Sequence, residues 1–177
     1  MDLARQQTAL LCLLKTGRAD ECDPYIQTVA GSEHLAILRE IILAWRLFDI
    51  QRHCQLTALL LKKRGRFEEA VKAFAATPNL SPFPDKLGEL FLRQMSEHAD
   101  QLVSCVARFE LFLTKVRLGD PGEYTIDWPT DPKRIITSLT QDGPLESLPV
   151  VAPHKMRISR CFPGLVQVRP VELLMSD

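Results

Sequence analysis

Few residues of this chain combine the type and the spacing that acid–base, nucleophilic or metal chemistry needs. His53 and Cys54 are adjacent, but neighbouring side chains on a helix point about 100° apart, so the two make a poor nucleophile–base pair. Glu97, His98 and Asp100 are typical of a solvated helix start. No His-x-x-x-His, Cys-x-x-Cys or His-Glu-x-x-His sequence occurs, and a closed zinc site needs about four ligands. We therefore expect neither a catalytic group nor a metal site in this chain.

The densest basic cluster lies where we predict a helix C-terminus. It comprises Lys62, Lys63, Arg64 and Arg66. Cations at that end of a helix offset the exposed carbonyl groups. The whole chain has 22 basic and 22 acidic residues, whereas a nucleic-acid-binding domain usually has a basic excess. A DNA-binding helix-turn-helix over residues 53–76 therefore stays the second hypothesis, and affinity that falls steeply with salt would reveal it.

The composition is that of a soluble globular protein, with 46% hydrophobic and 25% charged residues. The apolar run over residues 9–14 is too short for a signal peptide and follows no basic start. No stretch approaches the ~20 apolar residues of a membrane span. The five cysteines are widely scattered. We expect a cytoplasmic protein whose thiols are reduced and mostly buried.

The hydrophobic pattern changes at Gly119, and the residues before it recur at helical spacing. A helix that begins after Ser32 carries a wide apolar stripe, which we expect to be central to the core. We also expect that helix to break near residues 49–53, because continuing to Gly65 would make it long for a compact domain. The stripe comprises Leu35, Leu38, Ile41, Ile42, Trp45 and Phe48. Other expected helices cover residues 2–16, 21–30, 67–76, 85–95 and 98–118.

The segment after Gly119 has the pattern of short strands. Alternating apolar and polar residues predict strands over 124–128, 155–162 and 166–169, the last two joined by a turn centred on Pro163-Gly164. Asp131 and Pro132 are typical of the start of a short helix that runs to about residue 139. The fold class predicted is α+β: a helical body of about six helices over 1–119, and a tail over 120–177 with an antiparallel three-stranded sheet and one short helix.

A strand at the edge of such a sheet exposes unpaired backbone groups, to which an extended peptide can add itself. Pro170 cannot donate to a ladder, so the last strand should end there or lie at an edge. An equally weighted alternative is a sheet that merely closes the helical body. The candidate peptide-binding residues are Arg157, Ile158, Ser159, Arg160, Phe162, Val166, Gln167 and Arg169. The candidate partner contacts are Tyr124 and Trp128.

Several short motifs stand in an order that resembles a known family of helical partner proteins. These motifs are Ala44-Trp45-Arg46, Arg66-Phe67 with Val71 and Phe74, Ser81-Pro82 with Leu87-Gly88 and Phe91-Leu92, and Ala107-Arg108-Phe109-Glu110. The family comprises the accessory subunits of multinuclear-iron TIM-barrel enzymes that modify peptide cysteines, and it is often labelled a DNA-binding domain from its fold. The resemblance covers roughly residues 35–118. The short length and the tail are most similar to the methanobactin-biosynthesis (MbnC-like) members.

The resemblance implies a heteromeric complex with an MbnB-like iron enzyme. That complex would use dioxygen to convert cysteines of a precursor peptide into oxazolone and thioamide groups of a copper chelator. It implies no cofactor in this chain, because the iron and its ligands belong to the partner. This chain would bind the enzyme through an apolar interface of the helical body and help to hold the leader peptide. From the zero net charge and the lack of a long apolar stretch we expect no nucleic-acid partner and no membrane partner. A structural interaction domain of another assembly is the third hypothesis.

Overall fold

The computed structural model describes residues 3–17, 19, 24–77, 86–141, 143 and 152–171. Within these residues eight α-helices accompany one three-stranded sheet, which confirms the predicted α+β class. The helices are α1 (Leu3–Thr16), α2 (Pro24–Ala30), α3 (Glu33–His53), α4 (Gln55–Lys63), α5 (Phe67–Ala75), α6 (Leu87–Met95), α7 (Gln101–Arg117) and α8 (Pro132–Thr140). The strands are β1 (Tyr124–Trp128), β2 (His154–Ile158) and β3 (Val166–Pro170), with a 3₁₀ turn, η1 (Pro163–Leu165), before β3.

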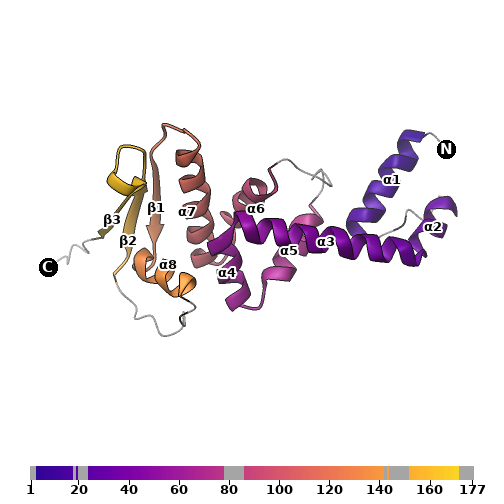
Figure 1. Ribbon diagram of the computed structural model, residues 1–177, viewed down its shortest axis with the longest axis horizontal. Coiled ribbons are helices and arrows are strands. Elements are labelled where there is room, and N and C mark those ends of the chain that lie inside the picture. The colour runs from indigo at the N-terminus through magenta and orange to yellow at the C-terminus, as the bar shows by residue number, and fades with distance from the viewer. Residues whose placement is uncertain are drawn as a thin grey trace.

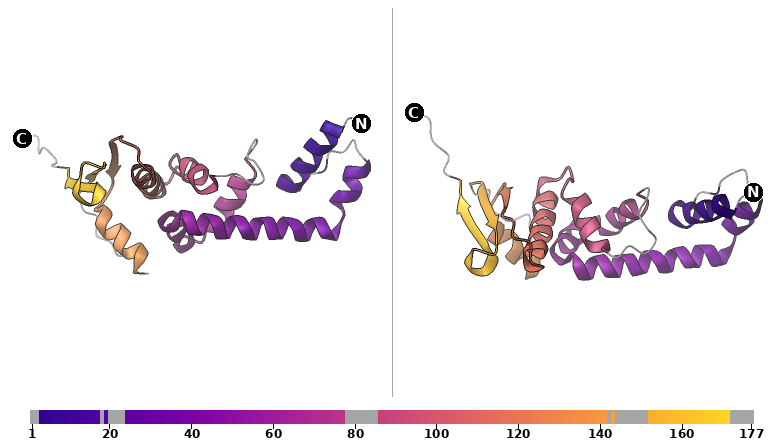
Figure 2. Two further views of the ribbon diagram at one scale, coloured as in Figure 1. Left: turned by 45° about the horizontal axis from the view of Figure 1, so that its top comes forward. Right: turned by 90° about the horizontal axis from the view of Figure 1, so that it is seen from above.

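The molecule is elongated, with the sheet at one end and α1 and α2 at the other (Figure 1). The long helix α3 runs from α1 and α2 to the middle of the molecule, and α5 and α6 lie on one side of it (Figure 2). A single buried cluster extends from the C-terminal part of α3 through α4–α7 to the sheet. The ring pair Phe74–Phe91, edge to face with centroids 5.4 Å apart, lies within this cluster. Helices α3–α8 and the sheet therefore share one core, to which no described residue of α1 or α2 belongs.

Most predicted boundaries are confirmed, because local turn and cap chemistry sets them. The first strand covers the predicted residues. Asp131 caps α8 by accepting a hydrogen bond from Lys133 N, with Pro132 in the first turn. Gly164 has φ +68° and ψ 14°, the conformation of the third residue of a type II turn. The predicted helix break occurs at Cys54, one residue later than expected. The starts of the helices predicted over 2–16, 21–30 and 85–95 lie outside the described residues.

The second predicted strand is shorter than expected. It ends at Ile158 because the chain then turns: Phe162 N donates to Ser159 O, and Leu165 N donates to Phe162 O. The sheet is antiparallel with the order β1-β2-β3, so β2 is central and β1 and β3 are its margins. This order decides which strand a guest peptide can reach.

The prediction that the apolar stripe of α3 is central to the core is wrong. Leu38, Ile41, Trp45 and Phe48 are exposed, and only Leu35 and Ile42 of that set are half-buried. The face of α3 that packs inward instead presents Leu43, Leu47 and Ile50. The helix is apolar on two faces, and its neighbours α4 and α6 cover one of them.

The expectation of mostly buried thiols holds for two of the four described cysteines. Cys54 and Cys105 are buried, whereas Cys12 and Cys161 are exposed. Burial raises the pKa of both buried thiols, that of Cys105 to about 11. These two thiols are therefore protonated donors at neutral pH.

Candidate peptide-binding edge

The hydrogen-bond pattern of β2 and β3 shows which backbone groups of β3 point outward. Ser159 N donates to Leu165 O at 2.9 Å, and Val171 N donates to Pro153 O at 2.8 Å. Hydrogen-bonded pairs alternate along an antiparallel ladder. The hydrogen-bonded pairs that lie between these two bonds are therefore Arg157 with Gln167 and Lys155 with Arg169.

The intervening residues of β3 turn their backbone groups away from β2. Val166 and Val168 each present an N–H and a C=O to the outer margin, and Pro170 presents its C=O alone. Among the described residues no strand pairs with this margin. An added strand would thus find two donors and three acceptors, and pairing would stop at Pro170.

The margin of β1 is less open. The same alternation turns the backbone groups of Thr125 and Asp127 away from β2. The thiol of Cys105, on α7, donates to Asp127 O at 3.3 Å. Helix α7 lies beside β1, whereas β3 is the outermost strand (Figure 1). The structure therefore favours β3 as the accepting margin.

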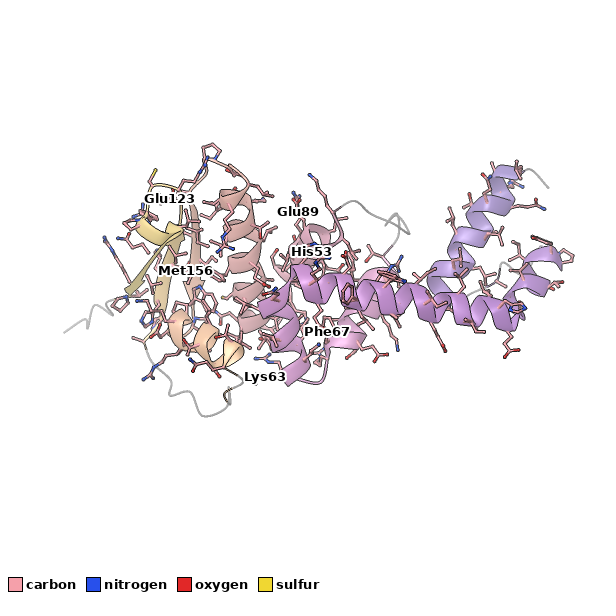
Figure 3. The ribbon with its side chains drawn as sticks, viewed as in Figure 1. His53, Lys63, Phe67, Glu89, Glu123 and Met156 are labelled. Carbon is pink, nitrogen blue, oxygen red and sulfur yellow. The ribbon has the colours of Figure 1, made fainter. Side chains whose placement is uncertain are left out.

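The two faces of the sheet separate the candidate residues. Ile126, Met156 and Ile158 are buried on the inner face, and Met156 can be seen within the sheet (Figure 3). The other face is polar, because it carries Thr125 and Asp127 of β1, Lys155 and Arg157 of β2, and Gln167 and Arg169 of β3. A guest strand beside β3 would face this polar surface with every second side chain.

The structure buries the side chains of two of the eight candidate peptide-binding residues and places that of a third, Val166, on the inner face opposite Ile158. Ile158 is fully buried and Ser159 is 3% exposed, so neither side chain can contact a peptide. The ring of Phe162 lies 5.0 Å from the Arg157 guanidinium. Arg160 donates to Gly119 O at 3.4 Å. The remaining members, Val166, Gln167 and Arg169, belong to β3 itself.

The polar face carries a net positive charge. Its cations are Lys155, Arg157 and Arg169, with Arg160 on the turn that follows β2. Two carboxylates oppose them: Glu123 forms an ion pair with Arg157 at 2.5 Å, and Asp127 lies 3.8 Å from Lys155. Within the described chain no ion pair is formed by Arg169. An acidic guest would therefore be favoured over a basic one.

The two candidate partner contacts differ in accessibility. Trp128 is 1% exposed, so its ring packs in the core and cannot meet a partner. Tyr124 is half-buried and stacks on Phe112 with centroids 4.3 Å apart. Its hydroxyl donates to Asp120 at 2.7 Å, and this bond raises the pKa of Tyr124. Of the two candidate partner contacts, only Tyr124 remains accessible at the surface.

The polar clusters seen in the sequence have structural partners. His53 Nδ1 lies 2.9 Å from Asp49 O, while the Cys54 thiol donates to Gly88 O at 3.4 Å, so the two side chains have separate partners. Asp100 caps α7 by accepting from Leu102 N. Within the described residues no three His, Cys, Asp or Glu side chains are grouped to hold a metal.

Most of the basic cluster is engaged inside the protein. Lys62 donates to Gln51 at 2.7 Å and lies over the ring of Phe67. Arg64 pairs with Asp100, and Arg66 lies 3.7 Å from Glu69. These contacts leave few charges of the cluster free for a phosphate backbone. A search of the described helices for one that is long and apolar enough to span a membrane finds none.

Two residues of the motifs that carry the family resemblance, Glu110 and Gly88, have structural roles here. Glu110 accepts from Leu56 N and Thr57 N, both at 2.8 Å, and so caps α4 from another helix. Burial raises the pKa of Glu110, and these hydrogen bonds oppose the rise. Gly88 is required by close packing, since a Cβ there would lie 2.8 Å from His53 Cβ. Ser81 and Pro82 lie outside the described residues.

Comparison with family models, with curated proteins and with solved structures finds no match for this chain.

Proposed function

We propose that this chain is the non-catalytic, peptide-holding subunit of an iron-dependent complex that oxidises cysteines of a precursor peptide, as in methanobactin biosynthesis. The observation that supports this role best is the open margin of β3, with outward backbone groups at Val166 and Val168 and cations beside it. The iron and its ligands belong to a TIM-barrel partner. The complex acts in the cytoplasm, where its thiols stay reduced.

The leader segment of the peptide binds as a fourth strand. Its backbone pairs with Val166 and Val168, and each hydrogen bond contributes about 0.5–1.5 kcal/mol. Acidic side chains at alternate positions of the leader face Arg169 and the neighbouring cations. Pro170 ends the pairing, because it has no N–H to offer.

This chain contributes to catalysis by position alone. A cysteine held next to the partner's metal reacts within a complex, and much of the entropic barrier to bringing the two together is removed. The iron enzyme docks on the part of the helical body that is nearest to the sheet, where the peptide leaves β3. The oxidation of the cysteine, with dioxygen as the oxidant, takes place on the partner.

A substitution in β3 tests the proposal. Val168→Pro removes one outward N–H and leaves the pairs of Gln167 and Arg169 with β2 in place, whereas Val168→Ala keeps the N–H. Binding of a synthetic acidic peptide that represents the leader segment of a cysteine-bearing precursor is measured by fluorescence anisotropy. We expect Val168→Pro to lower the affinity by about two- to tenfold, the contribution of one hydrogen bond, and Val168→Ala to retain it.

Reconstitution tests the division of labour. This chain, the iron enzyme and the peptide are combined with dioxygen, and peptide oxidation is followed by mass spectrometry. We expect oxidation by the full complex, slower oxidation with Val168→Pro at peptide concentrations below saturation, and none by this chain alone. Peptide oxidation by this chain in the absence of the enzyme would overturn the proposal. Circular dichroism confirms that each variant is folded.

A further inference from the structure

The helix α3 carries a long apolar face that no described element covers. We call it the α3 stripe: Ile37, Leu38, Ile41, Ala44, Trp45 and Phe48. The exposed fractions of Trp45 and Phe48 are 67% and 59%, and those of Ile37, Leu38 and Ile41 are between 44% and 48%. At about 100° per residue these positions fall on one side of the helix. Contiguous apolar surface of this kind marks an interaction site.

The α3 stripe is separate from the candidate peptide-binding edge. It lies on the side of α3 opposite to Leu43, Leu47 and Ile50, which pack into the core. The other helices of the body lie to one side of α3 (Figure 2). The sheet is at the far end of the molecule (Figure 1). A protein that receives a peptide from β3 therefore need not cover the stripe.

From this arrangement we infer that the α3 stripe is the interface between two copies of this chain, packed with their α3 helices antiparallel. The charges at the two ends of the stripe favour this occupant. Glu33 is exposed in the first turn of α3 and Arg52 is exposed in the last. An antiparallel pair places Glu33 of each copy beside Arg52 of the other. In the same arrangement the two helix dipoles are antiparallel, which is the favourable orientation for neighbouring helices.

The apolar positions are complementary in the same register. Ile37 of one copy faces Phe48 of the other, and Ile41 faces Ala44, so that a small residue meets a large one at the two-fold axis. A groove of about 340 Å³ beside Phe48 extends the surface past the end of the stripe. Its lining includes Arg52, Ala58 and Leu59. It receives the N-terminal turn of the other α3.

Two-fold symmetry closes this contact at a dimer, because the same patch is used by both copies. The antiparallel arrangement places the two sheets at opposite ends of the dimer, so both β3 margins stay open. Stable complexes bury about 800 Å² on each partner. Because one helix face and a groove form a modest interface, we expect a dissociation constant on the order of micromolar. The inference does not depend on the proposed peptide-holding function.

Sedimentation velocity of the full chain, without enzyme or peptide, tests the dimer over about 1–200 µM. We expect the fraction of dimer to rise with concentration. Ile41→Glu places a charge at the two-fold axis, so we expect the dissociation constant to rise by at least about tenfold. Leu118→Glu is the matched control, because Leu118 is 84% exposed but lies after α7, outside the stripe. We expect it to dimerise like the unaltered chain.

A charge exchange tests the antiparallel register. Glu33→Arg and Arg52→Glu each put like charges together, so each weakens the dimer, and the double variant restores it. Both positions are exposed, so the fold tolerates the changes. A chain that stays monomeric at all of these concentrations would overturn the inference. A dimer that Ile41→Glu leaves unchanged, or a stripe that only an added iron enzyme protects from hydrogen exchange, would also overturn it.

Discussion

The sheet end and the α3 stripe are both left uncovered by the folded chain, but they offer different chemistry to a partner. At β3 the available groups belong to the backbone of Val166 and Val168, and the side chains around them are charged. Along α3 the backbone is fully engaged in the helix, and the available surface consists of apolar side chains. Backbone groups select an extended guest, whereas an apolar helix face selects a complementary folded surface. We therefore propose two interaction surfaces on this chain that do not compete.

The largest effect on the free energy of unfolding is expected from a comparison of the buried and the exposed face of α3. Ile50 is fully buried, and Ile41 on the same helix is 48% exposed. Ile50→Ala leaves a cavity in the core and should lower the free energy of unfolding by about 2–5 kcal/mol. Ile41→Ala should change it by less than about 0.5 kcal/mol. Urea denaturation at submicromolar concentration measures both values without a contribution from association. Equal losses for the two variants would show that the stripe is packed.

The next effect concerns the carboxylate that joins α7 to α4. Glu110→Ala leaves the N–H groups of Leu56 and Thr57 without their acceptor in a buried site, so we expect a loss of about 1–3 kcal/mol. Glu89→Ala removes an exposed pair with Arg93 and should cost about 0.5 kcal/mol or less. Thermal and urea unfolding measure both variants. A Glu110→Ala protein as stable as Glu89→Ala would contradict the capping role.

A smaller effect is expected at the turn that starts β3. Gly164 has φ +68° with open space around its Cα, so Gly164→Ala should cost about 1 kcal/mol through backbone conformation alone. Gly31, which has an ordinary φ and no close neighbour, is the control. Gly31→Ala should stay within about 0.5 kcal/mol of the unaltered chain. A turn that tolerates alanine as readily as residue 31 would mean that the positive φ of residue 164 has no conformational cost.

The smallest expected effect on stability is at Arg169, which is exposed. Arg169→Ala should leave the free energy of unfolding within about 0.5 kcal/mol, yet weaken binding of an acidic leader peptide by up to about fivefold at low salt. Lys133→Ala, on the exposed side of α8, serves as the control and should leave peptide binding unchanged. Peptide affinity that does not respond to Arg169→Ala would place the guest away from the polar face.

Local features of the sequence were sufficient for much of the fold. The alternation over Tyr124–Trp128, the cap at Asp131 and the glycine at 164 depend on neighbouring residues, and all three predictions are confirmed. The orientation of α3 is different, since leucine and isoleucine occur on both of its faces. Tertiary packing decides which face is buried: α4 folds back after Cys54, and α6, which is distant in sequence, packs against the same face.

Local sequence patterns also could not predict which strand edge is free to accept a peptide. The outward direction of Val166 and Val168 follows from the pairing register of β3 with β2. The partial cover of β1 comes from Cys105, 22 positions from the residue that it contacts. The cap that Glu110 provides spans 54 positions. Contacts between such distant residues leave no periodic signal, and the burial of Ile158, Ser159 and Trp128 depends on them as well.

Hydrogen exchange at single-residue resolution tests the central claim, that β3 offers its outer margin to a guest strand. In the free chain the amides of Gln167 and Arg169, which bond to β2, should exchange slowly, while those of Val166 and Val168 should exchange rapidly. Addition of the leader peptide should slow exchange at Val166 and Val168 selectively. Protection of these two amides before any peptide is added, or no change at them on peptide binding, would contradict the account.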